Sequence, residues 1–436
     1  MPVSTLLLSG DFVTSKKMVA RILLLIIAIC VLPLSAQIIV LDTDATPDSL
    51  IAIATALSTA ADVRLITVSG TGTGASLASG VANVQGLLAL MNREDVVVAG
   101  GATESWSVRQ NRSSMTCALT VSLVQSSSAT WGLPPASPSF SRLLIETQNQ
   151  NRGRLLNAFD VDLLFGSAAD LPVPSPAGAW SPGQSPDATT ALTSLIRSQP
   201  LQSITYIALS TLTNLADFLS SSAVDVRGKL KKMHFVSGEI AVSTWLGSYE
   251  ASRLPLTSQW NVLVDPAAAS FVFHYSATSL IRYIYPLDAI GAIGFSEVRF
   301  RQYTADVLGA VGKAKPHVTW LATMLTRFRN AVVSALMVNG NLVDAATASA
   351  AFYDMFGPRS AFVVLVAVRD DIKASLDSTP VASAWKVLDN GVLSQSTSKT
   401  TGSAASTAQT QSFLFQVPPT SLNPFWTALR SVLLGN

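Results

Sequence analysis

Cysteine, histidine and charged side chains are scarce in this sequence, and each scarcity excludes a class of protein. The 436 residues include only two cysteines, Cys30 and Cys117, and three histidines. So few cysteines exclude a small fold held together by several disulfides. The histidines have no ligand spacing between them, so we expect neither a zinc site nor a histidine-based triad. Charged residues make up 13% of the chain and hydrophobic residues 49%, which excludes a disordered polyelectrolyte.

The small net charge argues against a nucleic-acid-binding protein. The formal charge is +2, and residues 1–36 contribute Lys16, Lys17 and Arg21 against Asp11. The rest of the chain therefore has 26 basic and 26 acidic residues, a net charge of zero. A neutral chain offers no electrostatic surface for a phosphate backbone. Small-molecule chemistry is the class of function that we expect.

The N-terminal segment has the pattern of a secretory signal. Residues 18–36 read MVARILLLIIAICVLPLSA, a basic start followed by an apolar run over 22–32 and then small residues. The run is too short for a comfortable membrane span and is typical of a signal peptide. We therefore expect residues 1–36 to be a signal peptide, with Met18 as a candidate true start, and residues 37–436 to be secreted. Membrane anchoring by an uncleaved N-terminal segment is the alternative.

Beyond the signal segment, short apolar runs alternate with longer stretches of helical periodicity. The candidate strands and helices are 38–41, 49–57, 64–70, 82–91 and 95–101, then 204–219, 232–238, 260–273 and 281–288, then helical stretches in 303–337 and 341–355, and finally 413–417 and 423–434. This alternation predicts a single α/β domain with a doubly wound, mostly parallel sheet. The Ser/Pro-rich stretch at about 104–188 is expected to be an insertion, and the Ser/Thr-rich stretch 394–412 a surface loop.

Three aspartates follow the first expected strand, in the sequence IIVLDTDATPDS (38–49). Side chains alternate along a strand, so Asp42 and Asp44 are expected to project to the same side, with Asp48 near the start of a helix. Ligands bind at the carboxyl ends of parallel strands, and clustered carboxylates suit Ca²⁺ or Mg²⁺. The alternative is that Asp42 or Asp48 only caps the next helix while Asp44 is solvated.

A glycine-rich loop follows the second expected strand. Residues 70–75 read GTGTGA, which contains a G-x-G-x-x-A match. This pattern alone suggests a dinucleotide site, but it follows the second strand and lacks a clear partner acid. A flexible turn beside the aspartates is the better interpretation, and a dinucleotide-binding oxidoreductase is the alternative.

An ordered series of motifs resembles the inosine-uridine-preferring nucleoside hydrolase family. DTDATPDS resembles that family's opening DTDxGxDD, and ITYIALSTLTNLA resembles its ITLVALGPLTNLA. SQWNVLVDPAAASFVF resembles AEFNIxxDPEAAxxVF, and YDMFG resembles the late HDP or WDP element. The resemblance runs from about 38 to 433, apart from the insertion. It implies a doubly wound α/β hydrolase that cleaves ribonucleosides to ribose and free base.

The resemblance also implies roles for individual residues. In this family a Ca²⁺ ion held by carboxylates binds the ribose diol and a water, and an aspartate takes the proton of that water. By position, Asp44 is implied to be this base. The implied metal ligands are Asp42, Asp44, Ser49, the Leu209 carbonyl and Asp354, and the implied substrate-binding residues are Asp48, Asn261, Gln259 and Tyr353. The implied partners are a nucleoside or related polyol and, in a homo-oligomer, further copies of the chain.

Several of these positions depart from the family. Ser49 replaces a metal-binding aspartate and Gln259 replaces a ribose-binding glutamate, and neutral groups hold Ca²⁺ more weakly. Thr46 stands at a family glycine, which predicts a different backbone there. The family's asparagine after the second strand has no equivalent, and Tyr353 replaces a histidine found in part of the family. Two hypotheses follow: a Ca²⁺-assisted hydrolase, or a secreted non-catalytic relative that binds a nucleoside or polyol.

Overall fold

The computed structural model describes the chain from residue 37 onward with gaps. The described residues are 37–71, 77–103, 106, 187–221, 228–237, 261–262, 265–275, 280–286, 290, 293–309, 315–339, 344–369, 381–382, 385–387, 393–395, 412–414 and 422–434. The expected signal peptide, nearly all of the expected insertion and Gln259 lie outside these residues. So does most of the expected surface loop, residues 396–411.

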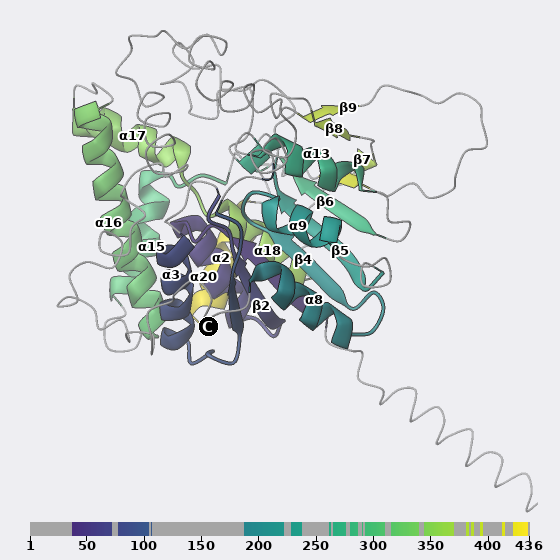
Figure 1. Ribbon diagram of the computed structural model, residues 1–436. Helices are drawn as coiled ribbons and strands as arrows, with labels where there is room; N and C mark the ends of the chain where they lie inside the picture. The colour runs from purple at the N-terminus through teal and green to yellow at the C-terminus, as the bar shows by residue number, and fades with distance from the viewer. Residues whose placement is uncertain are drawn as a thin grey trace, which may run out of the picture. The chain divides into compact units, whose positions relative to one another are not determined.

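A predominantly parallel sheet forms the centre of the fold (Figure 1). Its eight strands lie in the order β3-β2-β1-β4-β5-β6-β10-β7, and only the β10–β7 pair is antiparallel. The strands are β1 (Ile38–Thr43), β2 (Asp62–Val68), β3 (Val97–Gly100), β4 (Ile204–Ala208), β5 (Leu230–Val236), β6 (Ile281–Tyr285), β7 (Val381–Ala382) and β10 (Ser412–Leu414). Strands β8 (Trp385–Val387) and β9 (Leu393–Gln395) form a separate antiparallel pair. The strand order reverses between β1 and β4, which is where ligands bind in such sheets.

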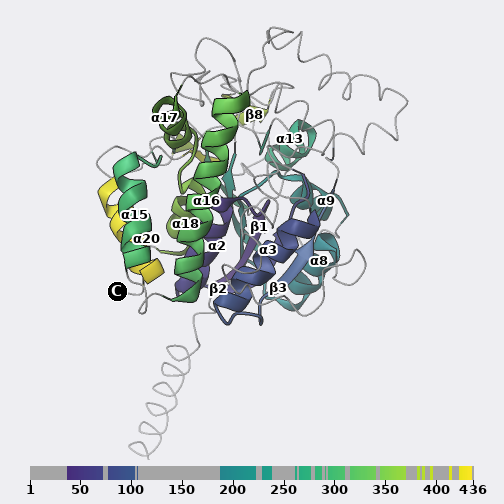
Figure 2. The same ribbon diagram turned by 90° about the vertical axis from the view of Figure 1, so that its left-hand side faces the viewer.

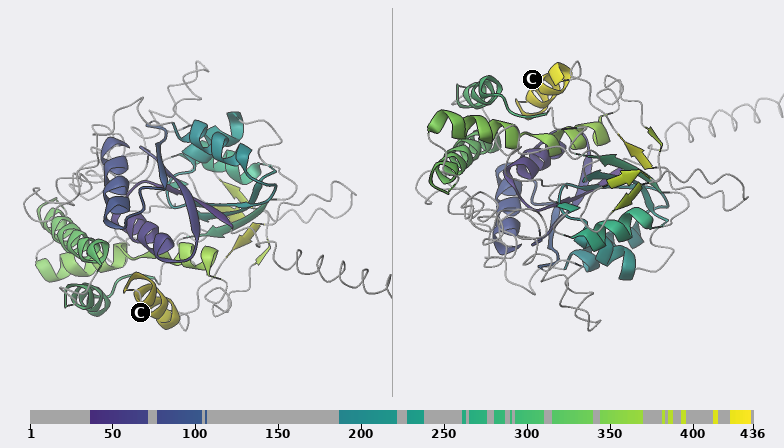
Figure 3. Two further views of the ribbon diagram at one scale, coloured as in Figure 1. Left: turned by 90° about the horizontal axis from the view of Figure 1, so that it is seen from below. Right: turned by 90° about the horizontal axis from the view of Figure 1, so that it is seen from above.

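Helices cover both faces of the sheet (Figures 2 and 3). One face carries α8 (Ala188–Ser198), α9 (Thr213–Ser221) and α13 (Pro266–His274). The other side carries α2 (Pro47–Ser58), α3 (Leu77–Leu90), α15 (Glu297–Gly309), α16 (Pro316–Asn339), α17 (Ala345–Met355), α18 (Arg359–Val368) and α20 (Leu422–Leu434). Residues Ile38–Asn436 group as one unit. The predicted single doubly wound α/β domain is therefore confirmed.

The central strand supplies side chains to two separate cores. Ile39 and Leu41 pack in one hydrophobic cluster, whereas Ile38 and Val40 pack in the other. All four side chains are buried. A strand with helices on both faces is apolar at every position, which is why these residues read as a continuous apolar run.

Two helices were not predicted from the sequence. They are α8 and α18. Helix α18 has the sequence RSAFVVLVAV, and it packs against α2 with most of its residues buried. Because α18 is short and rich in valine, its sequence has no helical period that would distinguish it from a buried strand. The predicted helical stretch 303–337 is also divided into α15 and α16. No helix among the described residues has both the length and the apolar composition needed to cross a membrane.

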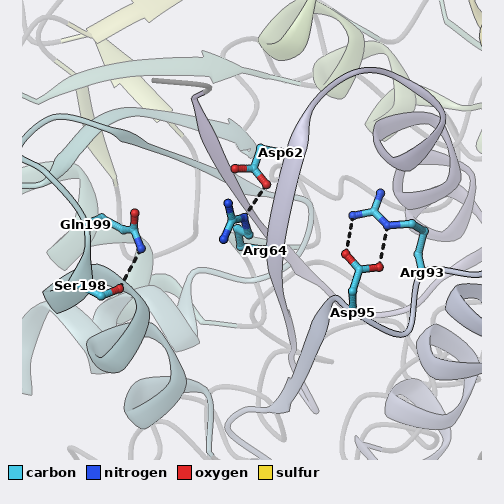
Figure 4. A network of polar contacts seen from close by, with 6 residues as sticks. All are labelled: Asp62, Arg64, Arg93, Asp95, Ser198 and Gln199. Atoms are coloured by element: carbon cyan, nitrogen blue, oxygen red, sulfur yellow. Dashed lines mark hydrogen bonds and ion pairs between the residues drawn. The ribbon is translucent and has the colours of Figure 1, made fainter. Parts of the chain in front are cut away.

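Charged pairs on the surface lie at the amino ends of the strands (Figure 4). Arg64 Nε lies 2.5 Å from Asp62 Oδ1 at the start of β2. Arg93 contacts Asp95 through Nε at 2.8 Å and Nη2 at 3.1 Å, just before β3. Exposed pairs of this kind contribute little to stability, because solvent screens the two charges. Buried polar groups instead gather at the opposite, carboxyl edge of the sheet.

Candidate functional site at the carboxyl edge of the sheet

A tight turn joins the end of β1 to the start of α2. Ala45 is buried and has a φ of 55°, which is unusual for a residue other than glycine. Its amide donates to Thr43 Oγ1 at 2.9 Å, which satisfies that amide inside the turn. Thr46 has an extended backbone, with φ −66° and ψ 160°, and caps α2 by accepting a hydrogen bond from the Ser49 amide. The left-handed residue is therefore Ala45, one position before Thr46, which stands where the family has a glycine. Thr46 fits the turn because it caps the helix from an extended backbone.

Asp44 is held by side chains of the same turn. Its side chain is buried, at 3% exposure. Its Oδ1 atom accepts hydrogen bonds from Thr46 Oγ1 at 3.0 Å and from Ser49 Oγ at 3.1 Å. Ser49 is also buried, and in this contact its hydroxyl donates its proton to Asp44. The residue that replaces a family carboxylate thus acts here as a hydrogen-bond donor to the expected base.

Asp42 has a different set of partners. Its carboxylate is fully buried and accepts hydrogen bonds from Thr67 Oγ1 at 2.7 Å, Asn214 Nδ2 at 2.8 Å and Ser210 Oγ at 3.4 Å. Burial raises the pKa of Asp42 to about 6, and the hydrogen bonds oppose this rise. Its described hydrogen bonds come from β2 and from the residues after β4, whereas those of Asp44 come from the β1–α2 turn. The structure therefore places Asp42 as a buried anchor of the loop that follows β4.

Asp48 joins two helices that are far apart in the sequence. It accepts hydrogen bonds from the Ser360 amide at 3.1 and 3.2 Å and from Ser360 Oγ at 2.6 Å. Pro358, the cap residue of α18, makes no side-chain capping bond, so Asp48 supplies the acceptor for that helix terminus. Burial raises the pKa of Asp48 to about 7; Asp44 raises it further, while Ser360 and Arg359 lower it. Asp48, expected to contact ribose, is thus bound to α18.

Leu209 and Asn261, two further expected site residues, lie together. The Leu209 amide donates to the Asp42 carbonyl at 2.8 Å, directly after β4. Asn261 Nδ2 donates to the Val236 carbonyl at 3.1 Å and lies 3.5 Å from the Leu209 carbonyl. Asn261 thereby links the carboxyl ends of β4 and β5. Both residues reach the edge of the sheet where the aspartates lie.

The remaining expected residues lie on α17. Tyr353 is buried, and its hydroxyl accepts a hydrogen bond from Arg329 Nε at 2.9 Å. Its ring packs against Phe300 and Phe352. Asp354 follows on the same helix, but its side chain lies outside the described part of the structure. The described contacts of Tyr353 are thus with α15, α16 and its own helix.

A cluster of buried hydroxyl groups at this edge was missed by the sequence analysis. Thr71 Oγ1 lies 2.7 Å from both Ser69 Oγ and Thr211 Oγ1, and 3.1 Å from Thr213 Oγ1. Thr213 Oγ1 donates to Asp265 Oδ2 at 2.7 Å. The cluster joins the ends of β2 and β4, the two neighbours of β1. Serine and threonine are too common in the sequence for their proximity to have been predicted.

The side chains that the structure describes do not by themselves complete a Ca²⁺ site. Among them, no group of three or more His, Cys, Asp and Glu residues could hold a metal ion. Ca²⁺ requires roughly six to eight oxygen ligands, several of them charged. Here Asp44 is bound by Thr46 and Ser49, and Asp48 is bound by Ser360. The substitution at Ser49 removes a charge from the position where the family has a carboxylate.

The fold and this edge define the class of protein. Carboxylates and hydroxyls gather beside the reversal of strand order in a doubly wound sheet, which is the place where α/β proteins of this class bind their ligands. Residues 39–387 match the sequence pattern of the family described as inosine-uridine preferring nucleoside hydrolase. The match covers most of the chain, and the protein belongs to the nucleoside hydrolase family.

Solved structures of nucleoside hydrolases have the same fold. A plant nucleoside hydrolase superposes with a TM-score of 0.55 at 15% identity, covering 92% of this chain and 100% of that one. A purine-preferring ribonucleoside hydrolase from Gardnerella vaginalis gives 0.56 at 14%, with the same coverage. An inosine-uridine preferring nucleoside hydrolase from Bacillus anthracis gives 0.57 at 11%, again with 92% and 100% covered. No curated protein sequence matches the chain. Identities this low establish the fold alone.

Proposed function

We propose that this chain binds ribonucleosides at the carboxyl edge of its sheet and hydrolyses their N-glycosidic bond to ribose and free base. The observation that carries the proposal is Asp44, a buried carboxylate directly after β1 and beside the reversal of strand order. It stands where the family has its catalytic base. Family membership supports this substrate class, since the family and the structures of the same fold are nucleoside hydrolases.

The proposed reaction uses Asp44 as a general base. A water attacks C1′ of the ribose while the C1′–N bond breaks, and the bonding electron pair leaves with the nucleobase. Asp44 takes the proton of the water, and the departing nucleobase is protonated from solvent. A nearby carboxylate stabilises the positive charge that develops on the sugar. The hydrogen bonds from Thr46 and Ser49 to Oδ1 hold the Asp44 carboxylate in place at the end of β1.

We propose further that the chain holds Ca²⁺ only weakly. Ser49 offers a neutral hydroxyl at the position of a family carboxylate, and that hydroxyl already donates to Asp44. A cation would lose one charged ligand and would have to displace this hydrogen bond.

The same contact favours a second candidate function, binding without cleavage. If Asp44 stays bound to Thr46 and Ser49, the fold can hold a nucleoside or polyol while the attacking water lacks activation. Activity and binding must therefore be measured separately.

Incubation of the purified protein with inosine or uridine, with Ca²⁺ and with chelator, distinguishes the two functions. Free base is followed by chromatography and nucleoside binding by calorimetry. The hydrolase proposal expects base release that falls by about 10²- to 10⁴-fold in Asp44→Asn. Asp95→Asn, an exposed aspartate near the amino end of β3, is the matched control and leaves release unchanged. Binding without release by the wild type supports the second function, and absence of both overturns the two together.

A further inference from the structure

Asp265 lies where three separate segments of the chain meet. It is fully buried and caps α13, with Oδ1 accepting from the Ala268 amide at 3.2 Å. Its Oδ2 atom accepts from the Trp106 amide at 2.6 Å and from Thr213 Oγ1 at 2.7 Å. A helix cap needs only the first of these bonds. The other two join segments that lie 159 and 52 residues away in sequence.

The bond to Thr213 reaches the candidate site through the loop between β4 and α9. Asn214, the next residue, donates to Asp42 Oδ1 at 2.8 Å and accepts from the Ala102 amide at 2.9 Å. The loop 209–214 is therefore held between two buried carboxylates, Asp42 and Asp265. This loop begins with the Leu209 carbonyl, which lies at the edge beside Asn261.

Asp265 also sets the direction of a hydrogen bond in the hydroxyl cluster. The Oδ2 atom of Asp265 accepts from Thr213, so Thr213 uses its one hydroxyl proton in this bond. The oxygen of Thr213 is then left to accept from its hydroxyl neighbours, Thr71 at 3.1 Å and Thr211 at 3.2 Å. Thr71 Oγ1 in turn lies 2.7 Å from both Ser69 Oγ and Thr211 Oγ1. Asp265 thus fixes the direction of one hydrogen bond at the end of the cluster.

We propose that Asp265 is the positioning residue of the nucleoside site. It acts through Thr213 on the loop 209–214, and through the Trp106 amide on the chain that follows β3. Its role at the site rests on the proposed binding of nucleosides there, whereas its anchoring of the two segments does not. Loss of the Thr213 bond would release segment 209–214 next to Asp42, and loss of the Trp106 bond would release the chain after β3, in neither case by a direct contact with Asp44.

The substitution Asp265→Asn separates this role from helix capping. Asparagine caps helices about as well as aspartate, so the start of α13 keeps its acceptor. The amide group has a single acceptor oxygen, however, and its NH₂ would face the two donors from Trp106 and Thr213. Asp187→Asn is the matched control, because Asp187 caps α8 by accepting from the Thr190 amide at 2.9 Å and is exposed.

Two measurements on the full-length protein test the proposal. Hydrogen exchange of the Trp106 amide and of the amides in 101–103 and 209–216 is expected to accelerate about tenfold or more in Asp265→Asn, and not in Asp187→Asn. Inosine affinity, measured by calorimetry, is expected to fall by a similar factor in Asp265→Asn alone.

The outcomes separate the proposal from the function on which it rests. Faster exchange confined to the first turn of α13 overturns the anchoring, and unchanged inosine affinity in a folded Asp265→Asn overturns the positioning role. If the wild type itself binds no inosine, the proposed function fails, and the exchange data alone decide whether Asp265 anchors the two segments.

Discussion

The substitution Ser49→Asp tests whether one residue separates this chain from a cation-binding relative. Ser49 Oγ lies 3.1 Å from Asp44 Oδ1, and both side chains are buried. An aspartate at position 49 would replace a hydrogen bond with a second negative charge. Two unit charges about 4 Å apart repel by about 4 kcal/mol at an effective dielectric constant near 20. We therefore expect the variant to be less stable than the wild type in chelator by an amount of this order.

Added Ca²⁺ should reverse part of this loss. A cation that binds only the folded protein stabilises it by about 2.7 kcal/mol at 100 times its dissociation constant. Urea unfolding in chelator and in CaCl₂ measures both effects, and calorimetry measures the binding itself. Ser49→Asn is the control, because it has nearly the same size as aspartate and no charge. Neither this variant nor the wild type should gain comparable stability from Ca²⁺.

Two results would refute this reasoning. Ser49→Asp could be as stable as the wild type in chelator, in which case the two carboxylates do not share one site. It could also lose stability and regain none with Ca²⁺, in which case the missing charge at position 49 is not what prevents cation binding.

Two further predictions concern polar groups around the site. Burial raises the folded-state pKa of Asp48 from 3.8 to about 7, so the folded state retains this proton longer and stability falls as the pH rises from about 4 to 7. The free energy of unfolding of Asp48→Asn, relative to that of the wild type, should therefore rise by up to about 3 kcal/mol between pH 5 and pH 8, as measured by urea unfolding. If the two proteins differ by the same amount at both pH values, the prediction is wrong. Gly101→Ala would place a Cβ atom 2.1 Å from Asn214 Oδ1, and we expect a loss of about 1–3 kcal/mol or more. A Gly101→Ala protein with wild-type stability would show that Asn214 can move away from Asp42 without cost.

Hydroxyl groups surround the carboxylates of this site. Ser49 and Thr46 donate to Asp44, Ser360 donates to Asp48, and the Thr71 cluster adjoins Asp265 through Thr213. A hydroxyl supplies a hydrogen bond without adding charge, so these carboxylates are satisfied by the protein itself. Hydroxyl donors at these described carboxylates distinguish this site from the site that the family resemblance implies, where carboxylates surround a cation.

Local sequence patterns were sufficient to predict the class of fold. Continuous apolar runs between helical stretches indicated a covered parallel sheet, because a strand buried on both faces leaves no polar alternation. The apolar run before DTDATPDS also indicated where the first strand ends, and β1 ends at Thr43, between Asp42 and Asp44. The helix α18 escaped prediction because ten mostly apolar residues have no period that separates helix from strand.

The partners of each aspartate were decided only by the tertiary structure. Asp48 is bound by Ser360, 312 residues away, and Asp265 by Thr213 and the Trp106 amide. Asp42 and Asp44 are two residues apart, yet one is bound by groups after β2 and β4 and the other by its own turn. Hydrogen bonds between distant segments depend on how the strands are ordered and how the helices pack on them, and no local pattern in the sequence encodes that arrangement.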